Sequence, residues 1–537
     1  MVTTHSSSPD REGLSVRHSN VALPVISAIL FVLIFPITAV DFSLWPLVFV
    51  CLVPLVCFCD SPLPLGWKAF GGFIWGALMA IGIAYWLFYA MVWQYGTSIP
   101  TAVVFMILCL MFPHGLLYSA FVSIYSIVRR QSLLSYVLVL PSLWVMADLA
   151  REAIPILVPW GSIGYGLQPW NAYLQAADLG GVYGLSFLAV MANGCLAWLS
   201  RTGGWGDFIR WFATRRIAQA RSFLAANRTG IIILLLILIL PPIYGTLRRA
   251  QVRRNAAHRF AAGGGITITA VQPNFSQRER WLAGGSIDRI ERCLAMSAKE
   301  GIVVWPETVV NAPSLARAEA FRYIRKRAPG PLLIVVGGVR PSHKRDGVYN
   351  TAYLIQKGGG VLWYDKNILL PYAESAPFGD ILGAYYTAPT EFLAGRTPSA
   401  VRTEAGVVGL SICFEVLYPS HAREAVRRGA GMLINISNDG WFGATSMPII
   451  HLRQASVRAV ETRRFMARSS NNGYSALITP TGEMTARTEL FVRQVASGKA
   501  AMLEVESLWL CAGDWVIYLS ALVSIASLCA ALFIKEE

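Results

Sequence analysis

The chain has 537 residues, of which 55% are hydrophobic and only 14% are charged, and its mean hydropathy is +0.49. This composition excludes a soluble protein of two or three domains and is typical of a membrane protein. The formal net charge of +15 does not indicate nucleic-acid binding. The excess arginine is concentrated in short loops beside apolar runs, where it sets topology and contacts anionic headgroups.

Apolar runs divide the chain into a membrane part and a more polar part. Residues 1–20 form a polar tail, and eight apolar runs follow, several of them near the ~20 residues that a spanning helix needs. The runs cover residues 23–40, 44–59, 70–93, 101–128, 133–147, 184–199, 230–244 and 510–534. The first is too long for the core of a secretory signal and has no evident cleavage site, so we expect an uncleaved helix. We predict seven spans over residues 21–250, a domain outside the membrane over 251–507, and a last span over 508–537.

Arginine distribution predicts the orientation. Eight spans place both ends of the chain on one side, and the short loops on that side carry Arg129, Arg130 and six arginines between residues 201 and 228. The positive-inside rule makes this side cytoplasmic and places the 251–507 domain outside. Four arginines between 248 and 254 oppose the rule, but the long domain behind them weakens their influence.

Short β-branched runs alternate with helical patterns through the outer domain. Strands are predicted over 266–271, 302–305, 332–336 and 431–435, and helices over 286–299, 313–327, 420–428 and 451–464. Such alternation predicts an α/β layered domain. Of nine cysteines only Cys293 and Cys413 lie in this domain, so there is no disulfide framework. Cys293 falls in an amphipathic segment and is expected in the core.

Three chemically active residues each stand at the end of a predicted strand: Glu307 after 303–305, Lys366 after a further strand that ends at 363–365, and Cys413 after the apolar run 407–412. A free thiol is mostly protonated at neutral pH, so a nucleophilic cysteine needs a base and a positive group for the oxyanion that follows attack. Glu307 would serve as the base and Lys366 as the cation. Taken singly, each is more often a core or surface residue, whereas the combination predicts a catalytic site.

Several sequence words around these residues resemble one protein family. They are YDKNILLPYAE (364–374), SICFE (411–415), NISNDGWFG (435–443), HLRQ (451–454) and SNNG (470–473), with PWGSIGY (159–165), YGLSF (183–187) and GDW (513–515) in the apolar part. Together they resemble the apolipoprotein N-acyltransferase branch of the carbon–nitrogen hydrolase (nitrilase) superfamily. The resemblance covers nearly the whole chain.

The resemblance implies an α-β-β-α sandwich with a Glu-Lys-Cys triad at strand ends, beside a multi-pass helical membrane domain. Glu374 and Glu415 match further acidic positions, where a carboxylate tunes the base or orients the lysine. Phe414 stands where the family often has tyrosine. Trp281 corresponds to an aromatic residue of a mobile arm that meets lipid. Asn435, Asn438, Asp439 and Trp441 are expected to shape the pocket wall.

The implied activity is acyl transfer through a Cys413 thioester, from a phospholipid to the N-terminal amino group of an S-diacylglyceryl-cysteine lipoprotein. It implies no cofactor or metal, a monomer, and a bacterial inner-membrane location with the catalytic domain in the periplasm. Three alternatives remain: a membrane-anchored amidase or nitrilase, a paralogue that acylates a different amine, and a non-catalytic scaffold, which the presence of all three triad residues disfavours. The second is suggested by departures from the family wording after the lysine, at Asn367, Tyr372, Ala373 and Ser375. Donor headgroup and acyl length stay open.

Overall fold

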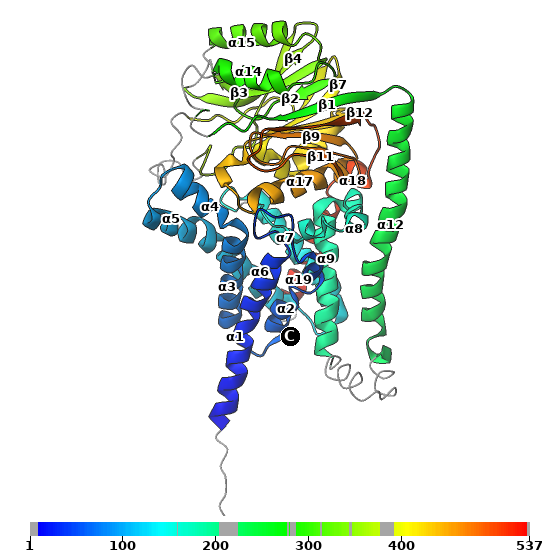
Figure 1. Ribbon diagram of the computed structural model, residues 1–537. Helices are drawn as coiled ribbons and strands as arrows, with labels where there is room; N and C mark the ends of the chain where they lie inside the picture. Colours follow the sequence, from blue (N-terminus) through cyan, green and yellow to red (C-terminus); the bar gives the residue numbers. More distant parts are fainter. Residues whose placement is uncertain are drawn as a thin grey trace, which may run out of the picture.

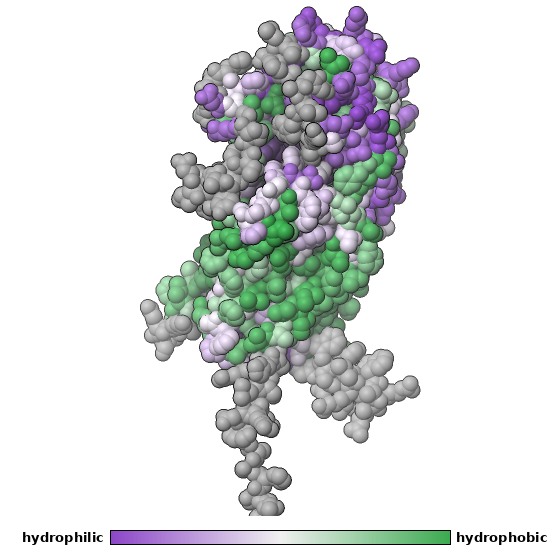
Figure 2. Space-filling model, turned by 60° about the vertical axis from the view of Figure 1, so that its left-hand side comes forward, coloured by the Kyte–Doolittle hydropathy of each residue, from purple (hydrophilic) through white to green (hydrophobic). Residues whose placement is uncertain are grey.

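The computed structural model describes residues 9–157, 159–202, 224–276, 279, 286–311, 314–342, 346–375 and 391–533. It has a helical half and a half built on two β-sheets, which lie one above the other in Figure 1. Apolar side chains gather over the helical half and hydrophilic ones over the sheet half (Figure 2). This division matches the predicted separation of a membrane part from a more polar domain.

The helical half contains most of the N-terminal residues and the C-terminal helix. Its elements are α1 (Pro9–Leu33), η1 (Trp45–Phe49), α2 (Val53–Asp60), α3 (Leu65–Ala84), α4 (Trp86–Tyr89), η2 (Ala90–Gln94), α5 (Ile99–Phe105), η3 (Met106–Met111), α6 (Phe112–Val128), η4 (Ser135–Val139), α7 (Leu140–Ala153), η5 (Ile163–Leu167), α8 (Asn171–Leu174), α9 (Ala177–Arg201), α12 (Arg228–Ala261), α18 (Leu508–Ala512) and α19 (Trp515–Phe533).

Five helices in the described part of the chain are long and apolar enough to cross a membrane: Leu65–Ala84, Ile99–Val128, Ala177–Arg201, Arg228–Ala261 and Trp515–Phe533. The run predicted as one span over 44–59 instead forms two short helices, η1 and α2. Each has a proline in its first turn, where the missing N–H leaves no helical bond unmade. The count of eight spans stays a prediction.

Close packing of α3 on α6 depends on two glycines one turn apart. A Cβ at Gly72 would lie 2.5 Å from the carbonyl oxygen of Tyr118, and one at Gly76 would lie 2.4 Å from that of His114. Because helices in a membrane associate mainly through van der Waals packing, small residues let their backbones approach. The Gly72–Gly76 spacing therefore fixes where these two helices cross.

The other half is a sandwich of two six-stranded sheets. One has the order β12-β1-β2-β3-β4-β5 and the other the order β11-β10-β9-β8-β7-β6. Their strands are β1 (Gly265–Gln272), β2 (Ile302–Val304), β3 (Leu333–Pro341), β4 (Val348–Gln356), β5 (Val361–Asp365), β6 (Ala400–Thr403), β7 (Gly406–Ile412), β8 (Met432–Ser437), β9 (Phe465–Ser470), β10 (Ala476–Ile478), β11 (Met484–Arg487) and β12 (Gln494–Ala501).

Helices cover both outer faces of the sandwich. Helices α14 (Ser286–Met296) and α15 (Ser314–Arg327) lie on the first sheet, while α16 (Pro419–Arg427) and α17 (Met447–Thr462) lie on the second, between it and the helical half (Figure 1). The predicted α-β-β-α order is therefore confirmed. Cys293 of α14 is fully buried, as expected of a core residue.

The chain passes between the halves through α12 and returns through β12. Helix α12 continues beyond residue 250 to Ala261, and β1 begins four residues later at Gly265. Strand β12 pairs antiparallel with β1 along its whole length, from Gly265 opposite Ala501 to Gln272 opposite Gln494. This pairing brings the chain back to the helical half before α18 and α19.

A buried ion pair joins the two halves. The Arg463 guanidinium, at the end of α17, lies 2.8 Å from the Asp178 carboxylate of α9, and it also donates to the side chain of Gln175. Arg248 of α12 contacts the same carboxylate at 2.8 Å. The side chains of Arg463 and Asp178 are almost fully inaccessible, so each charge depends on the other for compensation.

Replacing Asp178 by alanine should destabilise the protein strongly. The change leaves Arg463 buried without its carboxylate, and breaking a buried pair in this way costs about 3–5 kcal/mol. We expect a clear fall in the melting temperature of the detergent-purified protein. The control is Glu424→Ala, which removes an exposed pair with Arg428 and should change stability by at most about 1 kcal/mol. Equal melting temperatures for the two variants would contradict this role of Asp178.

Candidate active site

A cavity of about 400 Å³ lies where the sandwich meets the helical half. Glu307, Lys366 and Cys413 all line it, and all three are buried. The rest of its wall is mostly apolar and aromatic and comes both from the sandwich and from the helical half, where α4, η2, α5 and η3 contribute. Residues of the helical half in this wall include Trp86, Leu87, Ala90, Met91, Tyr95, Phe105, Leu110 and Trp160.

The three residues reach this cavity from strand ends, as the sequence predicted. Lys366 directly follows β5 and Cys413 directly follows β7, while Glu307 lies three residues beyond β2. Strands β2 and β5 belong to one sheet and β7 to the other. The thiol therefore faces the carboxylate and the ammonium across the interface between the sheets.

Left-handed backbone conformations concentrate at the cavity. Cys413 (φ 51°), Thr308 (φ 62°) and Tyr372 (φ 65°) line it, and each is a non-glycine residue with positive φ. Such a conformation costs roughly 1–2 kcal/mol per residue, so surrounding contacts must hold it. At Cys413 it turns the chain sharply from β7 into the short helix η8 (Cys413–Leu417).

Glu374 compensates the buried charge of Lys366. The Lys366 Nζ lies 2.6 Å from Glu374 Oε2, which also accepts a bond from the backbone N–H of Leu370. Burial alone would lower the pKa of Lys366, but the charges of Glu374, Cys413 and Glu307 raise it above its ordinary value. Lys366 therefore stays a cation throughout the physiological pH range.

Asn350 of β4 joins the two carboxylates of the cavity. Its Nδ2 donates to Glu307 Oε1 at 2.6 Å and to Glu374 Oε1 at 3.0 Å. One amide group thus fixes the orientation of the predicted base and of the carboxylate that holds Lys366. The sequence analysis did not find this residue, because an asparagine in the middle of a strand has no local signature.

The thiol of Cys413 is protonated in the resting protein. Burial, followed by repulsion from Glu307, raises its pKa to about 12, although Lys366 acts in the opposite direction. A thiolate is therefore a minor species at neutral pH. The thiol must lose its proton as it attacks, which a carboxylate base in the same cavity makes possible.

Glu415 lies behind the cavity and holds the two strand ends together. Its fully buried carboxylate accepts from the backbone N–H groups of Ile412 (2.8 Å), Asn367 (2.6 Å) and Ile368 (3.0 Å), and from the Tyr364 hydroxyl (2.8 Å). The residue before Cys413 and residues on both sides of Lys366 are thus tied to one side chain. Glu415 positions the site and does not line the cavity.

The remaining predicted residues occupy different places. Trp441 lines the cavity and stacks on Tyr95 at 4.9 Å, and Asn438 lines it too. Phe414 is buried against Trp160 of the helical half. Trp281 lies outside the described residues.

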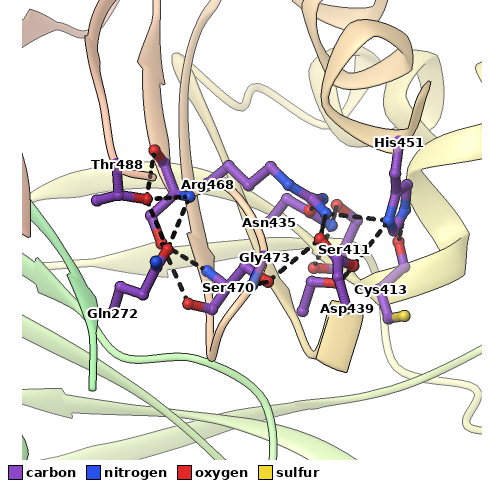
Figure 3. A network of polar contacts seen from close by, with 12 residues as sticks. Gln272, Ser411, Cys413, Asn435, Asp439, His451, Arg468, Ser470, Gly473 and Thr488 are labelled. Carbon is purple, nitrogen blue, oxygen red and sulfur yellow. Dashed lines mark hydrogen bonds and ion pairs between the residues drawn. The ribbon is translucent and has the colours of Figure 1, made fainter. Parts of the chain in front are cut away.

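Asn435 and Asp439 lie beneath the cavity in a buried polar network that includes His451 and Arg468 (Figure 3). Neither residue is part of the cavity wall, where the sequence analysis had placed both. In the sequence, His451 stands out only as part of a family word and Arg468 not at all, since both occupy ordinary helix and strand positions.

Two models of known protein domains match this chain. A carbon–nitrogen hydrolase domain model matches residues 264–507, which contain the sandwich and the cavity residues Glu307, Lys366 and Cys413. A model of the apolipoprotein N-acyltransferase N-terminal domain matches residues 27–195. The sandwich is therefore a carbon–nitrogen hydrolase domain joined to a second, helical domain.

Relatives match over most of the chain. An apolipoprotein N-acyltransferase of Geobacter metallireducens is 29% identical over 98% of both chains, and one of Azotobacter vinelandii is 28% identical over 87% of both. Among solved structures, Saccharomyces cerevisiae Nit3, of branch 10 of the nitrilase superfamily, is 16% identical over 44% of this chain and 90% of its own, with a TM-score of 0.35. The chain belongs to the apolipoprotein N-acyltransferase family.

The charges around Cys413 predict opposite effects of two substitutions on its reactivity. Glu307→Gln removes a repulsion and should lower the thiol pKa, whereas Lys366→Met removes an attraction and should raise it. Below the pKa, one pKa unit changes the thiolate fraction about tenfold. We expect faster alkylation of Cys413 by iodoacetamide in the first variant and slower alkylation in the second, measured by peptide mass spectrometry between pH 7 and 10. Glu424→Gln, on the surface, is the control, and a change in the same direction in both cavity variants would contradict the electrostatic description.

Proposed function

We propose that the chain transfers an acyl chain from a phospholipid to the α-amino group of an S-diacylglyceryl cysteine at the N-terminus of a lipoprotein. The observation that carries the proposal is the composition of the cavity wall. The same cavity presents Glu307, Lys366 and Cys413 on one side and apolar residues of the membrane helices on the other. A small amide substrate would not need this apolar surface, whereas the acyl chain of a phospholipid must be held against apolar side chains.

In the first half of the reaction, Glu307 accepts the Cys413 proton as the sulfur attacks the carbonyl carbon of the lipid ester. The negative charge that develops on the carbonyl oxygen faces the Lys366 ammonium, which Glu374 holds in place. As the C–S bond forms and the ester C–O bond breaks, the proton on Glu307 passes to the departing oxygen. A lysophospholipid leaves, and the acyl chain remains on sulfur as a thioester.

In the second half, the neutral α-amino group attacks the thioester carbonyl and Glu307 accepts an amine proton. The C–N bond forms, the C–S bond breaks, and the proton returns to the sulfur. Both steps of the reaction use the same base and the same cation, as a ping-pong mechanism requires. The product is an N-acylated lipoprotein, and the enzyme returns to its resting thiol.

Cys413→Ala should abolish acyl transfer while the protein stays folded in the membrane. Wild-type protein incubated with a phospholipid labelled in its acyl chains should retain label that neutral hydroxylamine removes, because thioesters are cleaved by that reagent. The variant should retain none, with an unchanged melting temperature as the control for folding. Hydroxylamine-sensitive label on Cys413→Ala would contradict the assignment, and release of free fatty acid without any acylated acceptor would favour a membrane-anchored hydrolase.

We also propose that the protein lies in the bacterial inner membrane with the sandwich on the periplasmic side. The arginines that follow α6 and those between α9 and α12 support this orientation through the positive-inside rule. An acceptor exported across the membrane is reached only from that side, so orientation and function depend on each other.

Single cysteines in a cysteine-free background test the orientation. Lys357→Cys lies in an exposed turn between β4 and β5, and Gln131→Cys lies in an exposed loop after α6. A membrane-impermeant maleimide added to intact spheroplasts should label the first directly and the second only after the membrane is permeabilised. The reverse pattern would place the sandwich in the cytoplasm and would refute both the orientation and the proposed acceptor.

A further inference from the structure

A buried polar network lies directly beneath the nucleophile. His451 of α17 is fully buried, and its Nε2 lies 3.1 Å from the backbone carbonyl oxygen of Cys413. Its Nδ1 lies 2.9 Å from Nη2 of Arg468 and 3.1 Å from Oδ1 of Asp439. In Figure 3 the ring stands between this pair and Cys413, whose sulfur points away from the network.

The partners of the ring determine its protonation. A carbonyl oxygen only accepts hydrogen bonds, so Nε2 must carry a proton to bond Cys413. An arginine only donates, so Nδ1 must offer a lone pair to Arg468. A neutral ring protonated at Nε2 meets both conditions. A doubly protonated ring would donate from Nδ1 to Asp439 Oδ1 but would also point that N–H toward the guanidinium, and in either state Nε2 keeps the proton that the Cys413 carbonyl accepts.

Charges around the ring favour the same state. Burial, followed by the charge of Arg468, lowers the pKa of His451. Burial opposes ionisation of Asp439, but the charge of Arg468 holds the pKa of its carboxyl below the ordinary range. Arg468 Nη2 lies 2.7 Å from Asp439 Oδ2, so these two charges compensate each other and the ring stays neutral.

Cys413 is thus held from both directions along the chain. Its left-handed conformation is unfavourable for a residue with a Cβ, so contacts outside the turn must maintain it. The N–H of the preceding residue, Ile412, is bound by Glu415 at 2.8 Å. The carbonyl of Cys413 itself is bound by His451. The edge of Trp160, from the helical half, packs against the imidazole ring at 5.8 Å between ring centroids.

We propose that His451 is a positioning residue for acyl transfer. Through its Nε2–H it holds the Cys413 carbonyl and so the left-handed turn that directs the thiol into the cavity, while Arg468, whose charge Asp439 balances, favours the tautomer that supplies this proton. The inference rests on the proposed function for its reaction, but the orientation of the thiol is measurable without that reaction.

Three variants separate the hydrogen bond from the bulk of the ring. The amide of His451→Gln reaches the place of Nε2 and still donates, the shorter amide of His451→Asn lies nearer the place of Nδ1, and His451→Phe keeps an aromatic ring without a donor. His258→Asn is the control, because His258 is exposed on α12. Each protein is measured for single-turnover acylation at saturating labelled phosphatidylethanolamine, for alkylation of Cys413 by iodoacetamide, and for melting temperature.

We expect the glutamine variant to acylate within about threefold of wild type. The asparagine and phenylalanine variants should be slower by about 10- to 100-fold, as expected when one buried hydrogen bond to the reacting residue is lost. Alkylation should follow the same order. If the phenylalanine variant does not fold, the glutamine and asparagine variants, which differ by one methylene, decide the matter.

Equal acylation rates for the glutamine and asparagine variants, or a wild-type rate for a folded phenylalanine variant, would overturn the proposal. A loss of melting temperature that parallels the loss of rate in all three would reduce His451 to a packing residue and would equally overturn it. If wild-type protein takes no hydroxylamine-sensitive label, the proposed function fails instead. The alkylation rates of the same variants then still decide whether His451 positions the thiol.

Discussion

The site depends on one buried cation. Lys366 is almost completely removed from solvent, and a buried ammonium is tolerated only with compensating charge and hydrogen bonds. Glu374 supplies the charge, Asn350 orients Glu374, and the same asparagine orients Glu307. In the resting state the cavity therefore holds one cation, two carboxylates and a neutral thiol. In the proposed reaction, moving the thiol proton to Glu307 leaves the total charge unchanged, so no ion has to be drawn into an apolar space.

The position of the cavity follows from how the two halves meet. Helix α17 covers the second sheet and also contacts the helical half, where Arg463 pairs with Asp178 and Arg458 donates to the Tyr165 hydroxyl at 3.1 Å. The layer that closes the sandwich is thus also the layer that fixes the membrane helices beneath it. His451 belongs to this same helix. The backbone of Cys413 is therefore bound to a helix that contacts both the second sheet and the helical half.

Local sequence signals and the family words predicted Glu307, Lys366 and Cys413 with the carboxylates Glu374 and Glu415, but not the supporting Asn350 and Arg468. Glu307, Lys366 and Cys413 each follow a short apolar run, and the structure places all three at strand ends around one cavity. Asn350 and Arg468 lie within strands, where only the partner across the sheet reveals their role. The apolar run at 44–59 predicts one span, because a hydropathy average does not show that Pro46 and Pro54 each begin a separate short helix. The strands of 465–501 were not predicted, since β10 (three residues) and β11 (four residues) are short and the fully buried β9 ends in an arginine and two serines.

Two wide helical turns form part of the cavity wall. Ala90 and Met91 of η2, and Cys109 and Leu110 of η3, face it from segments with π-helical hydrogen bonds. An i→i+5 bond accommodates one residue more than an α-helical turn, and one residue rotates everything after it by about 100°. In the helix from Ile99 to Val128, the extra residue in η3 rotates the turn that lines the cavity relative to the face of α6 that packs on α3. The two faces can therefore point in different directions. Deleting a single residue from η3 would thus change which side chains line the cavity while leaving the residues that pack α6 on α3 unchanged.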